Sequence, residues 1–370
     1  MYETVIWVAL VAAVLALAFE LIYRRTFTAL AGAGVALLGT ITAANVPLLD
    51  PSIKSLQPVL RSNLWLTIHV LTEVSSYAAF GLAWALGLIA TIYYLTATYR
   101  RSPSYGELAS PLVPAMPLLS IGVGGVAASY GAFGPEWTMS DALFYVFDVM
   151  AVVGGVVAAS ALLALTGEAV NRLTHRDIDG PKVDPFADPA PASAAASSRP
   201  RPTVEEIRAM AAPATLDARG QAMQETAAMI KPLSNFIYRA MQVGVLLIAA
   251  GTILGGVWAD YSWGRFWGWD PKEVWALITL LIYLVPLHGR FAGWVSTFGL
   301  VFASVVCFLS VVMAWYGVNF VLGVGLHSYG FVEGGSQGAM SLILSGMMAL
   351  PIGAAWRRHL GRARPVEVQA

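Results

Sequence analysis

The chain has 370 residues and no net charge, and 57% of its residues are hydrophobic while only 12% are charged. Several apolar runs reach about 20 residues, the length that a helix needs to cross a bilayer, which leaves too little polar sequence for a sizeable water-soluble core. We therefore predict an all-α, polytopic helical membrane protein. Because Cys307 is the only cysteine, an internal disulfide, a cysteine zinc cluster and a CxxC redox site are excluded.

Hydropathy predicts about nine transmembrane helices. Their approximate ranges are 5–23, 27–44, 64–97, 111–132, 142–165, 236–258, 274–290, 295–317 and 338–356. The third run is much longer than a bilayer requires, so we expect this helix to tilt or to project beyond the lipid.

The distribution of basic residues predicts an amino terminus outside and a cytoplasmic carboxyl terminus. Of the 22 lysines and arginines, this orientation leaves only Lys54, Arg61, Arg265 and Lys272 outside, as the positive-inside rule requires. The first apolar run has no basic region before it, so we expect a retained anchor rather than a cleaved signal peptide.

Composition and spans divide the chain into four parts. Residues 1–101 hold the first three spans, and residues 102–173 hold two additional spans. Residues 174–233 are rich in proline, alanine and serine, which predicts a flexible cytoplasmic linker, although a capping box favours a short helix near 203–211. Residues 234–370 carry the last four spans.

A loop between two spans concentrates tryptophan. Four of the thirteen residues from Trp263 to Trp275 are tryptophans, and glycines interleave them. Indoles at a membrane surface are common, so an interfacial belt remains one interpretation. Their density favours a second one, in which Trp263, Trp267 and Trp269 offer flat apolar faces to a planar aromatic ligand.

The same loop ends in a helix-start signal. Asp270 is a good N-cap, a proline follows it, and Glu273 stands at the third helical position, so these residues have a structural explanation. A helix amino terminus also attracts anions, and Lys272 and Arg265 add positive charge. Carboxylate tails of the ligand are expected to bind there.

Three histidines are candidate ligands for the iron of a haem, because imidazole is a common axial ligand. His69 lies about five residues into the third span, with Glu73 one turn further on the same face. His327 lies in a glycine-rich outer loop. His288 follows Pro271 by seventeen residues, which places it about 25 Å deeper along a helix, so it cannot bind the same iron.

Several other kinds of site are excluded because the sequence lacks their motifs. The chain has no pair of histidines about thirteen residues apart on one helix, so a permanent electron-carrying haem is disfavoured. It also has no phosphate-binding glycine loop, no nucleophile elbow and no HExxH sequence.

The pattern Trp-Gly-x-Phe-Trp-x-Trp-Asp-Pro-Lys-Glu-x-Trp, followed by Tyr283 through His288 and by Gly325 to Gly330, resembles the haem-handling proteins of cytochrome c biogenesis. It is similar to their CcsA (ResC) branch, the tryptophan-loop proteins of System II. The resemblance is strong from about residue 238 to 329 and returns at 65–80, whereas residues 102–231 match no motif.

This resemblance implies a membrane subunit of a holocytochrome c synthase, a haem lyase of the bacterial cytoplasmic membrane. Haem b would be bound transiently at the outer face between His69 and His327, which match the family's outer pair. It would then be joined by thioether bonds to the CxxCH segment of apocytochrome c. His288 matches an intramembrane histidine whose site a CcsB (ResB) partner completes, so a second subunit is implied. A thiol-reducing protein is expected as a further partner, and nucleic acid is not.

Two alternatives remain open. The chain can be a haem chaperone or exporter that delivers haem without attaching it, although the Pro-Lys-Glu continuation of the loop favours the synthase. A transporter whose tryptophan loop is only an interfacial gate is the other alternative, and it predicts a purified protein without haem absorbance.

Overall fold

The computed structural model describes residues 2–24, 26–46, 49, 52, 64–130, 140–175, 217–323, 325–327 and 337–362. These residues form helices and no strand, which confirms the all-α prediction. The predicted short helix near 203–211, the outer residues Lys54 and Arg61, and most of the predicted linker lie outside the described residues.

The helices follow the predicted spans in order. They are α1 (Tyr2–Tyr23), α2 (Thr26–Asn45), α3 (Leu64–Thr96), α4 (Tyr105–Ala109), α5 (Leu112–Ser129), α6 (Asp141–Thr174), α8 (Ala218–Trp263), α9 (Pro271–Phe291), α10 (Thr297–Val306), α11 (Phe308–Val312), the π-helix η2 (Met313–Leu322) and α12 (Gln337–Gly361).

Eight helical stretches in the described part of the chain are long and apolar enough to cross a membrane. The chain is therefore a multi-pass helical membrane protein. The stretch predicted as the ninth span forms α12, a helix of 25 residues with Arg358 and His359 in its last turn.

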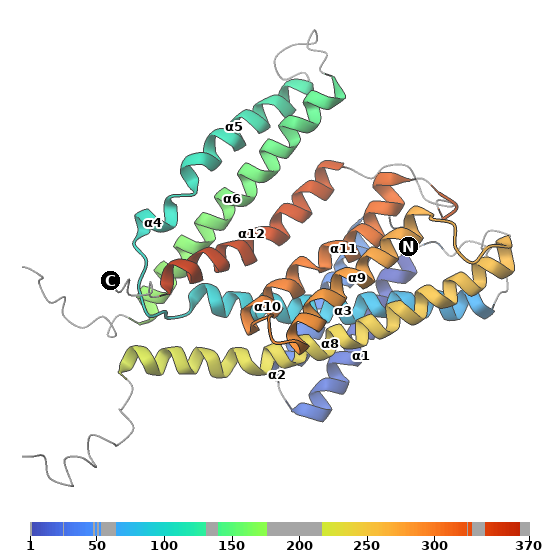
Figure 1. Cartoon of the computed structure of the whole chain (residues 1–370), viewed down its shortest axis with the longest axis horizontal. Helices are drawn as coiled ribbons and strands as arrows, with labels where there is room; N and C mark the ends of the chain where they lie inside the picture. The colour runs from blue at the N-terminus through green and yellow to red at the C-terminus, as the bar shows by residue number, and fades with distance from the viewer. Residues whose placement is uncertain are drawn as a thin grey trace, which may run out of the picture.

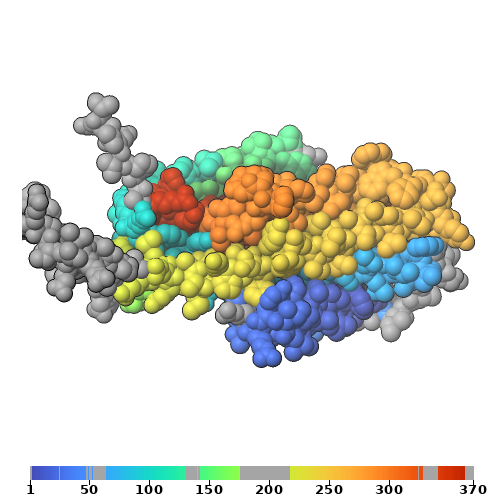
Figure 2. Space-filling model, turned by 60° about the horizontal axis from the view of Figure 1, so that its bottom comes forward, coloured from blue at the N-terminus to red at the C-terminus, as the bar shows by residue number. Residues whose placement is uncertain are grey.

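Two long helices form the centre of the fold. α3 has 33 residues and α8 has 46, and they pack side by side along the length of the molecule (Figure 1). α8 begins at Ala218, well before the predicted span and inside the predicted linker, because Asp217 caps it through the amide of Gly220. In the space-filling view α8 runs along the surface next to the first two helices (Figure 2).

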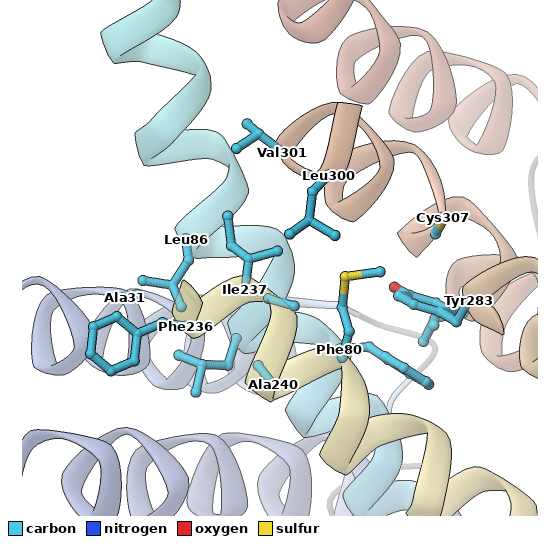
Figure 3. Packing of buried hydrophobic residues seen from close by; sticks show 14 of the residues in the cluster. Ala31, Phe80, Leu86, Phe236, Ile237, Ala240, Tyr283, Leu300, Val301 and Cys307 are labelled. Carbon is cyan, nitrogen blue, oxygen red and sulfur yellow. The ribbon is translucent and has the colours of Figure 1, made fainter. Parts of the chain in front are cut away.

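The core lies where α3, α8, α9 and α10 meet (Figure 3). The ring of Phe80 on α3 stacks on the ring of Tyr283 on α9, with centroids 3.7 Å apart. Ile237 and Leu300, both fully buried, pack in the same cluster. This packing fixes the helices that carry the tryptophan loop relative to the helix that carries His69.

The two additional spans form a hairpin at one side. α5 packs on α6, α6 packs on α12, and the hairpin projects away from the central helices (Figure 1). An ion pair anchors its base: the guanidinium of Arg357 on α12 donates to Glu168 on α6 at 2.8 and 3.1 Å and to the carbonyl of Ala97 at 2.7 Å. Because Glu168 and Arg357 are each only 1% exposed, the pair is buried between three segments.

Candidate functional site

One cavity of about 460 Å³ lies at the end of the molecule that carries the tryptophan loop. Its wall contains residues from α1, α3, α8, the loop and α9. The predicted site residues that line it are His69, Glu73, Trp267, Lys272 and His327. The volume is within the range of about 300–1,000 Å³ that is usual for small-molecule sites, and residues far apart in the sequence line this one cavity.

His69 is the sixth residue of α3, as its place in the sequence predicted. Its Nδ1 lies 2.7 Å from the carbonyl oxygen of Gly251 on α8. A carbonyl oxygen only accepts, so Nδ1 carries the hydrogen and Nε2 keeps its lone pair. This is the tautomer that can bind a metal through Nε2.

His327 has the same arrangement with a different acceptor. Its Nδ1 donates to a carboxylate oxygen of Asp270 at 2.7 Å, which again leaves Nε2 with its lone pair. Burial lowers the pKa of His327 below its ordinary value, although the hydrogen bond to Asp270 acts in the opposite direction. Burial therefore favours the neutral imidazole, the form that can coordinate a metal.

Asp270 joins the loop to His327. It is the N-cap of α9 in a complete capping box with Glu273, and a proline follows it, as the sequence predicted. One carboxylate oxygen accepts from the amide of Lys272, and the other accepts from the amide of Leu326 next to His327. The same carboxylate therefore caps α9 and holds His327, and Asp270 is not among the residues that line the cavity.

Glu273 organises the tryptophan loop. Its carboxylate accepts from the amides of Gly268 and Asp270, at 2.8 and 3.1 Å, and from the guanidinium of Arg265 at 3.1 Å. Arg265 also lies over the ring of Trp263. It is not among the residues that line the cavity, so its contacts in the described part of the chain hold the loop together.

The three predicted tryptophans have different positions. Trp267 lines the cavity. Trp263 contacts the imidazole of His327 edge-on, with ring centroids 5.3 Å apart. Trp269 is 71% exposed and contacts Trp267 from outside the cavity, and its backbone has a positive φ of 58°, which is uncommon for a bulky residue. The loop thus presents one indole to the cavity and one to its surroundings.

Lys272 lies at the inner wall of the cavity. Its ammonium group donates to the side-chain oxygen of Asn319 at 3.0 Å. Asn319 belongs to the π-helix η2 and also donates to the carbonyl of Trp315. Lys272 is half-buried, and its ammonium group beside the first turn of α9 suits a carboxylate, while Glu73 and Glu273 line the same cavity.

The sequence analysis missed several residues of this site. Trp258 and Thr252 on α8 line the cavity. The indole nitrogen of Trp258, the hydroxyl of Thr252 and both carboxyl oxygens of Glu73 are buried without a hydrogen-bond partner among the described residues. Buried polar groups are usually paired, so these atoms fit a cavity that takes a ligand with polar substituents.

Glycines on α8 allow the close approach to α3. A Cβ at Gly251 would lie 2.3 Å from a carboxyl oxygen of Glu73, and one at Gly255 would lie 2.6 Å from the imidazole Cε1 of His69. Gly244 meets Phe80 of α3 in the same way. Their spacing of seven and four residues puts them on one helix face, and this spacing is the signal in the sequence that could have identified the contact.

Replacing Gly255 by alanine is expected to displace the His69 imidazole and to lower ligand binding, because the new methyl group overpacks the contact at a cost of about 1–3 kcal/mol. The measurement is the thermal unfolding of the purified protein, together with any haem absorbance that co-purifies with it. Gly124→Ala is the matched control, since a Cβ at Gly124 has no neighbour within 4 Å. Equal haem absorbance and equal unfolding temperature in the Gly255→Ala variant and the wild type would contradict the close contact between Gly255 and His69.

His288 does not line this cavity. It lies in the last turn of α9, at the opposite end from Lys272 and exposed. Its Nδ1 donates to the carbonyl of Leu284 at 2.8 Å, which leaves Nε2 as the acceptor. The structure therefore separates His288 from the cavity that His69 and His327 share.

The sequence matches the family described as cytochrome C assembly protein over residues 1–327. It is 45% identical over 106 residues to cytochrome c biogenesis protein CcsA of Pinus thunbergii, a match that covers 28% of this chain and 32% of that protein. The CcsA proteins of a Synechococcus strain and of Prochlorococcus marinus are 46% and 47% identical, over 28% of this chain and 33% of their own length. The chain thus matches about a third of the length of these relatives, while the family match covers most of the chain. The chain belongs to the cytochrome c assembly protein family.

Proposed function

We propose that this protein binds haem b transiently in the cavity between His69 and His327 and presents it to the CxxCH segment of an apocytochrome c for thioether attachment. The proposal rests on the position and the tautomer that the two histidines share. Both line one cavity, and both donate Nδ1–H to a protein acceptor, so each keeps an Nε2 lone pair. Two such imidazoles suit the two axial positions of a haem iron.

The other residues of the cavity suit the rest of the haem molecule. Lys272, at the amino terminus of α9, would bind a propionate, and Trp267 would lie against the porphyrin. Trp258 and Thr252 offer further polar atoms without partners among the described residues. Membership of a cytochrome c assembly family supports haem as the substrate.

The proposed reaction joins each cysteine thiol to a haem vinyl group. The sulfur bonds to the vinyl carbon next to the ring and the thiol hydrogen goes to the terminal carbon, so the addition is balanced without another reactant. Holding both groups in position accounts for much of such a rate enhancement. The protein's contribution is therefore orientation, and one of its histidines must leave the iron when the histidine of CxxCH binds.

The orientation proposed from the basic residues places this cavity on the extracytoplasmic side of a bacterial cytoplasmic membrane. His288 then lies near the cytoplasmic face, exposed and with a free Nε2 acceptor. We propose that a CcsB (ResB)-like subunit contacts this face and supplies the second ligand of an inner haem site. A thiol-reducing protein would keep the cysteines of the apocytochrome reduced.

Co-expression tests the proposal. The chain is expressed with a ResB-like subunit and an apocytochrome c, and covalently bound haem is detected in the cytochrome after denaturing electrophoresis. Covalent product that depends on this chain is the expected result. Haem that co-purifies with the chain without any covalent product would instead support a non-catalytic carrier, and a chain without haem absorbance would contradict both functions.

Variants of Trp267 and Trp269 test where the haem lies, because only Trp267 lines the cavity. Trp267→Ala is expected to lower haem occupancy by about tenfold, because an aromatic face in the cavity is lost. Trp269→Ala removes an exposed indole and is expected to leave haem occupancy within about twofold of the wild type. Both variants are measured by haem absorbance per protein. A larger loss from Trp269→Ala than from Trp267→Ala would contradict the proposed position of the haem.

A further inference from the structure

A second cavity lies against the first half of α8, away from the tryptophan loop. Its volume is about 630 Å³, and it lies between the end of α1 and the first half of α8. Lys231, Asn235 and Arg239 line it along one face of α8, and Tyr23 lines it from α1. The proposed haem chemistry uses none of these residues.

The charge of this cavity is positive. Lys231 and Arg239 are both exposed, and within the described part of the chain neither forms a salt bridge. The residues that line the cavity include no carboxylate. The two cations are eight residues apart, about two helical turns, so both can face one anion that lies against α8.

A proline also interrupts the backbone hydrogen bonding of α8 beside the cavity. Pro232 lies inside α8 and has no amide hydrogen, so the carbonyl of Ala228 cannot receive its usual bond from residue 232. Ala228 lines the cavity. The cavity therefore combines cationic donors with a carbonyl acceptor, which suits an anion that carries a hydroxyl group beside its charge.

The cavity lies at a level along α8 that corresponds to a membrane surface. The apolar part of α8 lies between Arg239 and Asp260, and these 21 steps of about 1.5 Å span about 31 Å, the thickness of the hydrocarbon layer. Arg239 is thus at the boundary between hydrocarbon and headgroups, and Asn235 and Lys231 lie beyond it. Tyr23, at the end of α1, has the amphipathic ring that is typical of this level.

We propose that this cavity binds the headgroup of an anionic phospholipid, with the phosphate between Lys231 and Arg239 and a headgroup hydroxyl on the carbonyl of Ala228. Phosphatidylglycerol has this combination of groups. Basic cavities between transmembrane helices are suited to phospholipid headgroups. The aromatic floor of the cavity, where the ring of Phe236 meets the ring of Tyr23 with centroids 5.0 Å apart, gives the acyl chains an apolar path into the bilayer.

Lipid binding to the purified full chain tests the proposal. The protein is mixed with phosphatidylglycerol or with phosphatidylcholine, and the lipids that it retains are counted by native mass spectrometry. Preferential retention of phosphatidylglycerol is expected. The variant Lys231→Gln/Arg239→Gln is expected to weaken this binding by about 30-fold, since each basic residue near an anionic surface contributes about fivefold.

The matched control is Arg100→Gln/Arg362→Gln, which removes the same charge from exposed positions outside the cavity. It is expected to retain phosphatidylglycerol like the wild type, and thermal unfolding verifies that both variants are folded. Equal lipid loss from both double variants, or wild-type binding by Lys231→Gln/Arg239→Gln, would overturn the site. Displacement of the lipid by an equal concentration of glycerol phosphate would overturn the assignment to a membrane lipid, because it would identify a site for soluble phosphate.

Discussion

Replacing His69 or His327 by alanine is expected to abolish covalent haem attachment, with a loss of more than about 100-fold. Changes to groups that only orient a metal ligand already cost about 10–100-fold, and each of these histidines is itself a proposed ligand. The measurement is the yield of haem-bound cytochrome in the co-expression assay, together with the haem absorbance of the purified protein. Imidazole added to the culture is expected to restore part of the yield, since it can replace the missing side chain in the cavity.

His175→Ala is the matched control, because His175 contacts Asn171 and Thr174 at the end of α6 and does not line the cavity. Its yield should equal that of the wild type. A wild-type yield from either His69→Ala or His327→Ala would remove the axial-ligand proposal. A loss without rescue by imidazole, together with a lower unfolding temperature, would show instead that the histidine is structural.

The second large effect is expected at the buried ion pair that anchors the α5–α6 hairpin. Arg357→Met removes two hydrogen bonds to Glu168 and one to the carbonyl of Ala97, and it leaves Glu168 with Arg172 as its remaining cation among the described residues. Breaking a buried pair on one side costs about 3–5 kcal/mol, because the other charge stays buried. The unfolding temperature of the purified protein in detergent is expected to fall accordingly.

The double variant Arg357→Met/Glu168→Gln tests why Arg357→Met lowers the stability. If the cost comes from a buried charge that Arg172 alone compensates only in part, removing the charge of Glu168 as well should recover part of the stability. Arg362→Met, an exposed arginine near the same end of α12, should leave the unfolding temperature unchanged. No change from Arg357→Met would contradict the anchoring role of the pair.

The sequence determined the features that depend on neighbouring residues. Apolar runs predicted where the spans lie, because a helix must bury its backbone and side chains in lipid over a fixed length. The order Asp270, Pro271 and Glu273 predicted the start of α9, because capping is a local interaction. The place of His69 early in α3 followed from the same reasoning.

Tertiary structure decided the features that depend on distant contacts. The sequence did not show that Asp270 orients His327, that Gly251 and Gly255 let α8 contact Glu73 and His69, or that Trp269 points away from the cavity that Trp267 lines. Most of these contacts join residues that are far apart in the chain, and the hydrogen bond from His69 to Gly251 spans 182 positions. Local propensity carries no information about such pairs, because they form only when separate helices pack. The sequence therefore fixed which side chains are available, and the packing of α3, α8 and α9 decided which of them share one cavity.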